Sequence, residues 1–125
     1  MTRARQYSIH LARVHDRDAT SSGARLLVDR LWPRGISKES LHLDEWIRDV
    51  GPSTELRKWF DHDPARFAEF STRYRSELDS NDEAVGKLLD WCRDGPVTLL
   101  FAAHDEDHNN AVVLRDYLKA RLDRD

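Results

Sequence analysis

The chain has 125 residues, of which 39% are hydrophobic, and this length and composition predict one folded domain spanning residues 1–125. Its 20 basic and 23 acidic side chains give a formal net charge of −3, which argues against a general nucleic-acid-binding protein, because such domains are strongly basic. A single cysteine, no apolar run near the ~20 residues of a membrane span, and no apolar segment behind the N-terminal basic residues together predict a cytoplasmic protein.

Three segments have the patterns of β-strands. Residues 7–14 partly alternate apolar and polar side chains, as a half-buried strand does. Residues 25–32 begin with an apolar run and are predicted to form a second strand, with a helix as the competing interpretation. Residues 96–103 are almost continuously apolar, which is typical of the central strand of a parallel sheet covered on both faces.

Helical patterns fill most of the remaining chain. We predict helices near residues 41–50, over 54–60, from Asp63-Pro64 to about 79, up to Gly95-Pro96, and from about 110 to 122. Phe67, Phe70, Tyr74 and Leu78 recur at steps of three and four, which predicts the buried stripe of the third of these helices. Ser80 and Glu83 have the spacing of a capping box, which predicts the start of the fourth.

The order of these elements predicts an α/β domain. We expect a small, mainly parallel sheet covered by helices in three layers, Rossmann-like but without the glycine-rich phosphate-binding motif. If the second and third strands are parallel, the segments after residue 31 and after residue 103 leave the sheet at the same carboxyl edge. Open α/β sheets bind ligands at that edge.

The first candidate site follows the second strand and contains Asp29, Arg30, Trp32 and Arg34. Guanidinium groups match the geometry of phosphates and carboxylates, and an indole offers a flat face to a ring, so these residues predict ligand binding. Pro33 and Gly35 predict a type I turn over residues 32–35. In the alternative, structural interpretation, Arg30 pairs with Asp29 or another carboxylate, and Trp32 fills the core.

The second candidate site is the polar run of residues 104–110, between the last strand and the last helix. His104 or His108 is suited to acid–base catalysis with Asp105 orienting the ring, and Asn109 is a further ligand-binding candidate. The two histidines also resemble a zinc motif, but that motif needs a continuous helix, so we predict no metal and no other cofactor. The structural alternative makes Asp107 or Asn109 the cap of the last helix.

Three further residues are weaker candidates. His62 lies beside carboxylates as a catalytic histidine does, although isolated histidines more often have no catalytic role. Arg57 is expected on a solvated helix face from which it could reach the rim of the site. Cys92 falls on the apolar stripe of its helix, which predicts a buried thiol rather than a nucleophile.

The sequence resembles the DUF488 family, and in particular its YeaO-like branch, over nearly the whole chain. The segments that carry this resemblance are residues 28–39 (VDRLWPRGISKE), 52–60 (PSTELRKWF), 62–64, 70–74, 98–100 and 108–109. It implies a small bacterial or archaeal cytoplasmic α/β protein with no settled substrate. Other branches have a Cys-His-Arg-type motif after the last strand, where this chain has Asp107-His108-Asn109-Asn110.

These observations predict an enzyme or a binding protein for a small phosphorylated or nucleotide-like ligand at the carboxyl edge of the sheet. In this hypothesis Arg30 and Arg34 bind the anion, Trp32 stacks on the ligand, and Asp29 orients an arginine or the ligand. The alternative is a non-catalytic domain that contacts nucleic acid or a protein, and the net negative charge disfavours nucleic acid. The sequence predicts neither the reaction nor the oligomeric state.

Overall fold

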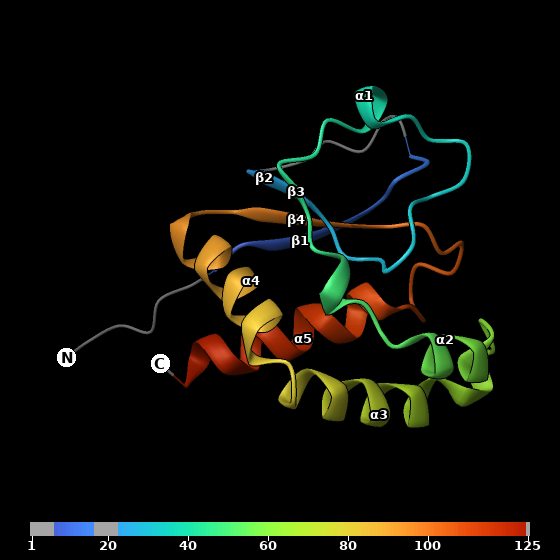
Figure 1. Ribbon diagram of the computed structural model, residues 1–125. Helices are drawn as coiled ribbons and strands as arrows, with labels where there is room; N and C mark the ends of the chain where they lie inside the picture. The colour runs from blue at the N-terminus through green and yellow to red at the C-terminus, as the bar shows by residue number, and fades with distance from the viewer. Residues whose placement is uncertain (1–6, 17–22, 125) are drawn as a thin grey trace.

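A four-stranded parallel sheet lies at the centre of the computed structural model, which describes residues 7–16 and 23–124 (Figure 1). The strands are β1 (Ile9–Arg13), β2 (Ala24–Leu27), β3 (Glu45–Trp46) and β4 (Val97–Phe101). Their order across the sheet is β1-β4-β2-β3, and every neighbouring pair is parallel. The predicted α/β fold with a parallel sheet is confirmed.

The last strand is the central one, as its apolar sequence predicted. β4 pairs along its length with β1, from Ile9 beside Val97 to Arg13 beside Phe101, and on its other side with β2. All five residues of β4 are buried. An apolar run is stable here because both faces of β4 are covered and both of its edges are hydrogen-bonded.

The longer helices cover one face of the sheet (Figure 1). They are α2 (Thr54–Phe60), α3 (Phe67–Asp79), α4 (Asp82–Asp94) and α5 (Asn110–Asp123). The predicted stripe of α3 is confirmed, since Phe70, Tyr74 and Leu78 are buried in the main core and Phe67 packs against it.

A thinner layer covers the opposite face. It consists of the one-turn helix α1 (Lys38–Leu41) and the chain around it, which Figure 1 shows on the other side of the sheet. Leu27, Leu41 and Leu100 form a separate buried cluster there, with Trp32 and Trp46 packed against it. Leu27 belongs to this cluster and Leu26 to the main core because successive strand residues face opposite sides.

Two predicted elements around the first loop differ from the structure: the second strand is present but shorter than predicted, and residues 41–50 do not form the predicted helix. The second strand ends at Leu27 rather than at residue 32, so residues 28–36 are a loop. The helix predicted over 41–50 is replaced by the end of α1, the two-residue strand β3 and the short 3-10 helix η1 (Arg48–Val50). Pairing of β3 with β2 at the sheet edge outweighs the local helical pattern.

The predicted turn and capping box also differ in detail. The turn is centred on Arg34 and Gly35, one residue later than predicted, and Gly35 has a φ of 74°, which suits the third position of a type II turn. Ser80 is the C-cap of α3 rather than the N-cap of α4, because α4 begins one residue later than predicted and its N-cap position is Asn81, which makes no side-chain cap. Asp63 does cap the segment that opens α3, accepting from the N–H of Ala65 in the 3-10 helix η2 (Pro64–Arg66).

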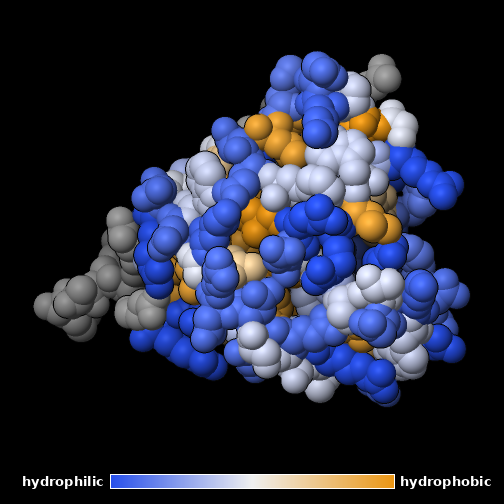
Figure 2. All heavy atoms as spheres, viewed as in Figure 1, coloured by the Kyte–Doolittle hydropathy of each residue, from blue (hydrophilic) through white to orange (hydrophobic). Residues whose placement is uncertain are grey.

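The surface is polar on the side shown in Figure 2, where hydrophilic side chains surround separate apolar patches. Within the described ranges, no helix is both long enough and apolar enough to cross a membrane.

Candidate functional site

A cavity of about 630 Å³ lies at the carboxyl edge of the sheet, where β2 and β4 end side by side. Most of its lining comes from the 28–36 loop, from the chain between β4 and the start of α5, and from α2 with the residues on either side of it, and His15 and Phe70 complete it. Its lining includes Asp29, Arg30, Trp32 and Arg34 from the first predicted site, and His104, Asp105 and Asn109 from the second. The fold therefore brings the two predicted constellations together at one cavity.

Arg30 holds the loop before α2 in place. Its Nε donates to the carbonyl of Pro52 and its Nη2 to the carbonyl of Gly51, both at 2.9 Å. A planar guanidinium can bridge two neighbouring carbonyls in this way because its donors form a rigid fork. Two of the Arg30 donors are thus committed to the protein, and neither goes to the Asp29 carboxylate that the structural interpretation suggested.

Trp32 is half-buried between the cavity and the thinner layer. Its Nε1–H donates to the carbonyl of Ile36 at 2.7 Å, and its ring meets Trp46 edge to face with centroids 5.3 Å apart. The Nε1–H of Trp46 in turn donates to the carbonyl of Asp29. Trp32 therefore both packs against the thinner layer of the fold and lines the cavity.

The Asp29 carboxylate links the loop after β2 to the chain after β4 by two hydrogen bonds. Its Oδ2 accepts from the backbone N–H of Ala102 at 2.9 Å, and its Oδ1 accepts from the side-chain amide of Asn110 at 3.1 Å. Burial raises the pKa of this carboxyl above its ordinary value, while the two hydrogen bonds and the charges of Arg57 and His62 act in the opposite direction. Both oxygens accept from N–H groups, as those of an ionised carboxylate do, and these bonds offset part of the effect of burial.

Arg34 and Arg57 are the exposed guanidiniums of the cavity lining. Neither side chain makes a hydrogen bond or an ion pair with a residue of the described ranges. Arg57 lies on α2, and its charge lowers the pKa of Asp29 across the cavity. Both side chains can therefore contact a ligand without breaking an existing contact.

The loop after β4 is ordered by Asp105. Its Oδ1 accepts from the backbone N–H of Asp107 at 2.9 Å and of His108 at 3.1 Å, and its Oδ2 lies 2.9 Å from Nδ1 of His108. These hydrogen bonds, that of Asp107 first, lower the pKa of the Asp105 carboxyl. Asp105 orients His108, as the catalytic hypothesis required.

The two histidines of this loop point to different neighbours. The ring of His108 packs edge to face on Phe67 of α3, with centroids 5.1 Å apart, and His108 is not among the lining residues of the cavity. His104 does line it, and its Nδ1 lies 3.1 Å from Nη2 of Arg13. Arginine can only donate, so this contact favours the tautomer of His104 with its proton on Nε2.

Asn109 caps the last helix, which is the structural alternative that the sequence offered. Its Oδ1 accepts from the N–H of Val112 at 3.0 Å, and its Nδ2 donates to the carbonyl of Asp105 at 2.8 Å. The side chain is buried and both of its polar ends are used. Its next neighbour, Asn110, bonds to Asp29, so the start of α5 is tied to both loops of the cavity.

Two lining residues had only weak sequence signals. His62 lies in the cavity wall because Asp61 and His62 both adopt left-handed backbone conformations, with φ of 49° and 54°. Such conformations are uncommon outside glycine and cluster at functional sites. His15, at the end of the described N-terminal segment, also lines the cavity. The neighbouring carboxylates of Asp61 and Asp63 made His62 a weaker candidate in the sequence, whereas no pattern singled out His15.

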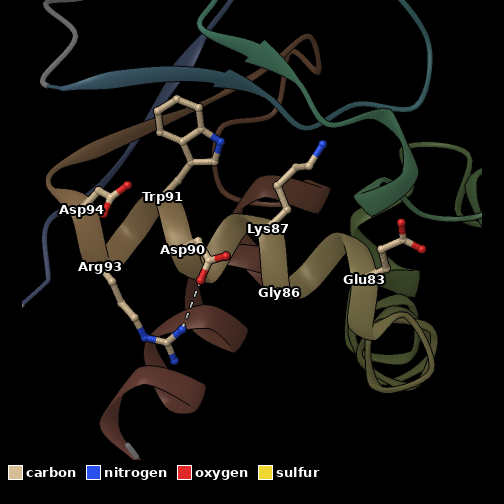
Figure 3. Close-up of a pocket in the computed structure, with 7 residues that line it drawn as sticks. All are labelled: Glu83, Gly86, Lys87, Asp90, Trp91, Arg93 and Asp94. Carbon is tan, nitrogen blue, oxygen red and sulfur yellow. Dashed lines mark ion pairs between the residues drawn. The ribbon is translucent and has the colours of Figure 1, made fainter.

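A second hollow, of about 540 Å³, runs along α4 (Figure 3). Figure 3 shows Asp90 and Arg93 on one side of the helix, where they form an ion pair at 3.7 Å. Lys87 and Trp91 point toward the sheet, and each donates a hydrogen bond to the carboxylate of Glu45 on β3. These contacts attach α4 to the sheet edge, so the hollow is a structural junction.

Comparison with known proteins agrees with the resemblance noted in the sequence. A family model described as "Inactive DUF488-N3 subclade" matches residues 8–125. The chain belongs to the DUF488 family. The uncharacterized protein YeaO of Escherichia coli is 43% identical over 113 residues, which are 90% of this chain and 98% of YeaO. The uncharacterized protein Rv3073c of Mycobacterium tuberculosis is 38% identical over 117 residues, 94% of this chain and 98% of that protein. No solved structure gives a significant match.

The cysteine of this DUF488 protein lies away from the cavity. Cys92 is buried on α4, as its position on the apolar stripe predicted, and burial raises the pKa of its thiol to about 11. A thiol with this pKa is almost entirely protonated at neutral pH and is a poor nucleophile. Within the described ranges, no three His, Cys, Asp or Glu side chains come together as metal ligands would.

Proposed function

We propose that this DUF488 protein binds a small phosphorylated or nucleotide-like ligand in the carboxyl-edge cavity and does not turn it over. The observation that carries the proposal is the pair of exposed guanidiniums, Arg34 and Arg57, lining a cavity of about 630 Å³. Pockets of about 300–1,000 Å³ are typical of small-molecule sites. The single cysteine suits a cytoplasmic setting, in which phosphorylated metabolites are abundant.

The lining has the two kinds of surface that such a ligand needs. Trp32 is half-buried and contributes aromatic surface against which a ring can pack, and Phe60 and Phe70 line the cavity as buried residues of the core. Arg34 and Arg57 supply donors that match phosphate oxygens and are not bonded to other described residues. Arg30 stabilises the cavity wall, because it donates hydrogen bonds to the carbonyls of Gly51 and Pro52 in the loop before α2.

Three observations favour binding over catalysis. His108, the histidine that Asp105 orients, is outside the cavity lining and packs on Phe67. Cys92 is buried on α4, so a thiol nucleophile is not available at the cavity. The matching family model is itself described as an inactive subclade.

The proposal is tested by thermal unfolding in the presence of inorganic phosphate, ribose 5-phosphate and AMP. A ligand that binds only the folded state stabilises it by about 2.7 kcal/mol at a concentration of 100 times Kd, which raises Tm by several degrees. We expect at least one of these compounds to raise Tm in the wild-type protein, and Arg57→Ala to remove most of that rise.

Arg75→Ala is the matched control, because Arg75 is also exposed on a helix but does not line the cavity. It should retain the full rise in Tm. Equal rises in Arg57→Ala and the wild type, or no rise with any of the three compounds, would contradict the proposal. A response to single-stranded RNA alone, with the steep salt dependence of phosphate-backbone contacts, would also contradict it and favour an interaction domain.

A further inference from the structure

The cavity contains a carboxylate as well as arginines. Asp29 is half-buried at the junction of β2, β4 and α5, whereas Arg34 and Arg57 are exposed. All three residues line the cavity. An anionic ligand would meet favourable charge at the exposed guanidiniums but repulsion at the more buried carboxylate. The charge of the lining therefore favours a ligand with an anionic group at one end and no negative charge at the other.

The Asp29 carboxylate retains the capacity to accept further hydrogen bonds. Each of its oxygens accepts one bond, from Ala102 N–H or from the Asn110 amide, and a carboxylate offers about four acceptor positions. Both donors are neutral, and no described residue forms an ion pair with Asp29 within 4 Å. Burial raises its pKa, which is the expected result of an incompletely compensated charge.

Aromatic surface lies in the lining together with these polar groups. Phe60 and Phe70 stack with centroids 4.2 Å apart, and both line the cavity, as does Trp32. Of these three, Trp32 is half-buried and has accessible ring surface, whereas Phe60 and Phe70 are buried in the core. A flat ring packed on Trp32 would share the cavity with Asp29 and could turn one edge toward its carboxylate. For that edge to be stabilised, it must donate a hydrogen bond.

We infer that the ligand is a phosphorylated compound with an amino-substituted aromatic ring, such as an aminopurine or aminopyrimidine nucleotide, whose amino group donates to Asp29. This inference rests on the proposed function, since it needs the phosphate to bind at Arg34 and Arg57. A sugar phosphate would leave the aromatic surface and the carboxylate uncontacted. A nucleotide without the amino group would bury the carboxylate without a donor.

The inference is tested by calorimetric titration of the wild-type protein with two matched pairs of nucleotides. The first pair is AMP and purine riboside 5′-monophosphate, and the second is CMP and 2-pyrimidinone riboside 5′-monophosphate. Within each pair only the amino group is removed. A hydrogen bond to a charged group predicts that AMP or CMP binds about 10-fold or more tightly than its partner lacking the amino group.

Asp29→Asn is expected to abolish this preference within the pair, while Arg57→Ala should weaken both members similarly. The comparison of nucleotides in the wild-type protein does not depend on whether Asp29→Asn folds normally. Equal affinity within both pairs would overturn the inference while leaving the proposed function intact, provided that binding still requires Arg57. Absence of binding by all four nucleotides and by ribose 5-phosphate would instead refute the proposed function.

Discussion

Arg30→Ala is expected to destabilise the folded protein even when no ligand is present. The substitution removes two hydrogen bonds of 2.9 Å from a charged group to the carbonyls of Gly51 and Pro52, both of which are buried residues. Hydrogen bonds to charged groups contribute about 1.5–3 kcal/mol each. Arg30 is partly exposed, so we take the lower end and expect a loss of about 3 kcal/mol for the two together.

Arg34→Ala is the matched comparison for this effect. Arg34 is exposed and makes no hydrogen bond or ion pair with a described residue, so its removal should change stability by less than about 0.5 kcal/mol. Arg30→Lys should be intermediate, because an ammonium keeps the charge but lacks the fork that reaches two carbonyls.

Urea unfolding of the three variants and the wild type, without ligand, measures these differences as shifts in the midpoint at constant slope. Thermal unfolding should give a Tm for Arg30→Ala about 10 °C below the wild type. If Arg30→Ala and Arg34→Ala were equally stable, the assignment of Arg30 to supporting the fold, and of Arg34 to the ligand, would be refuted.

Three further predictions follow from the structure. Carboxyl NMR titration should give Asp29 a pKa above 3.8 and Asp105 a pKa below 3.8. Asp29 then stabilises the folded state at low pH and loses that contribution as the pH rises through its folded pKa. The contribution of Asp105 is instead lost as the pH falls through its lowered pKa. At a pKa of about 11, roughly one Cys92 thiol in a thousand is ionised at pH 8, so a disulfide reagent should modify Cys92 only after unfolding, and rapid modification of the native protein would contradict its burial. Gly86→Ala should stabilise α4 by about 0.5–1 kcal/mol without affecting ligand binding, because a Cβ there meets nothing within 4 Å. Gly23→Ala should strongly destabilise the fold, because Gly23 has a φ of 69° and a Cβ there would lie 1.9 Å from the Pro96 carbonyl oxygen. Urea unfolding that shows Gly86→Ala less stable than the wild type, or Gly23→Ala as stable as the wild type, would refute the corresponding assignment.

The elements that the sequence predicted well are those whose burial follows from their own side chains. The apolar run of β4 and the spacing of Phe70, Tyr74 and Leu78 on α3 each require a covered position, whatever the partner. β3 has no such signal. Glu45 and Trp46 form a strand because they pair with Leu26 and Leu27, and a two-residue strand is too short to show a period.

The position of the candidate site was also predictable, because polar runs after two parallel strands must meet at one sheet edge. The contacts that each residue makes within the site could not be predicted from the sequence. The partners of Arg30 are backbone carbonyls 21 and 22 residues away, which no side-chain pattern marks. His62 reaches the cavity through a backbone conformation that its sequence does not require.

The most direct test of the proposed binding site is its location by amide NMR. In a titration of the 15N-labelled protein with AMP, the account predicts that the largest chemical-shift changes fall on residues 29–34, on Arg57 and His62, and on residues 102–110, which line or border the cavity. Changes confined to α4 around Lys87 and Trp91, or spread evenly over the surface, would contradict a ligand site at the carboxyl edge of the sheet.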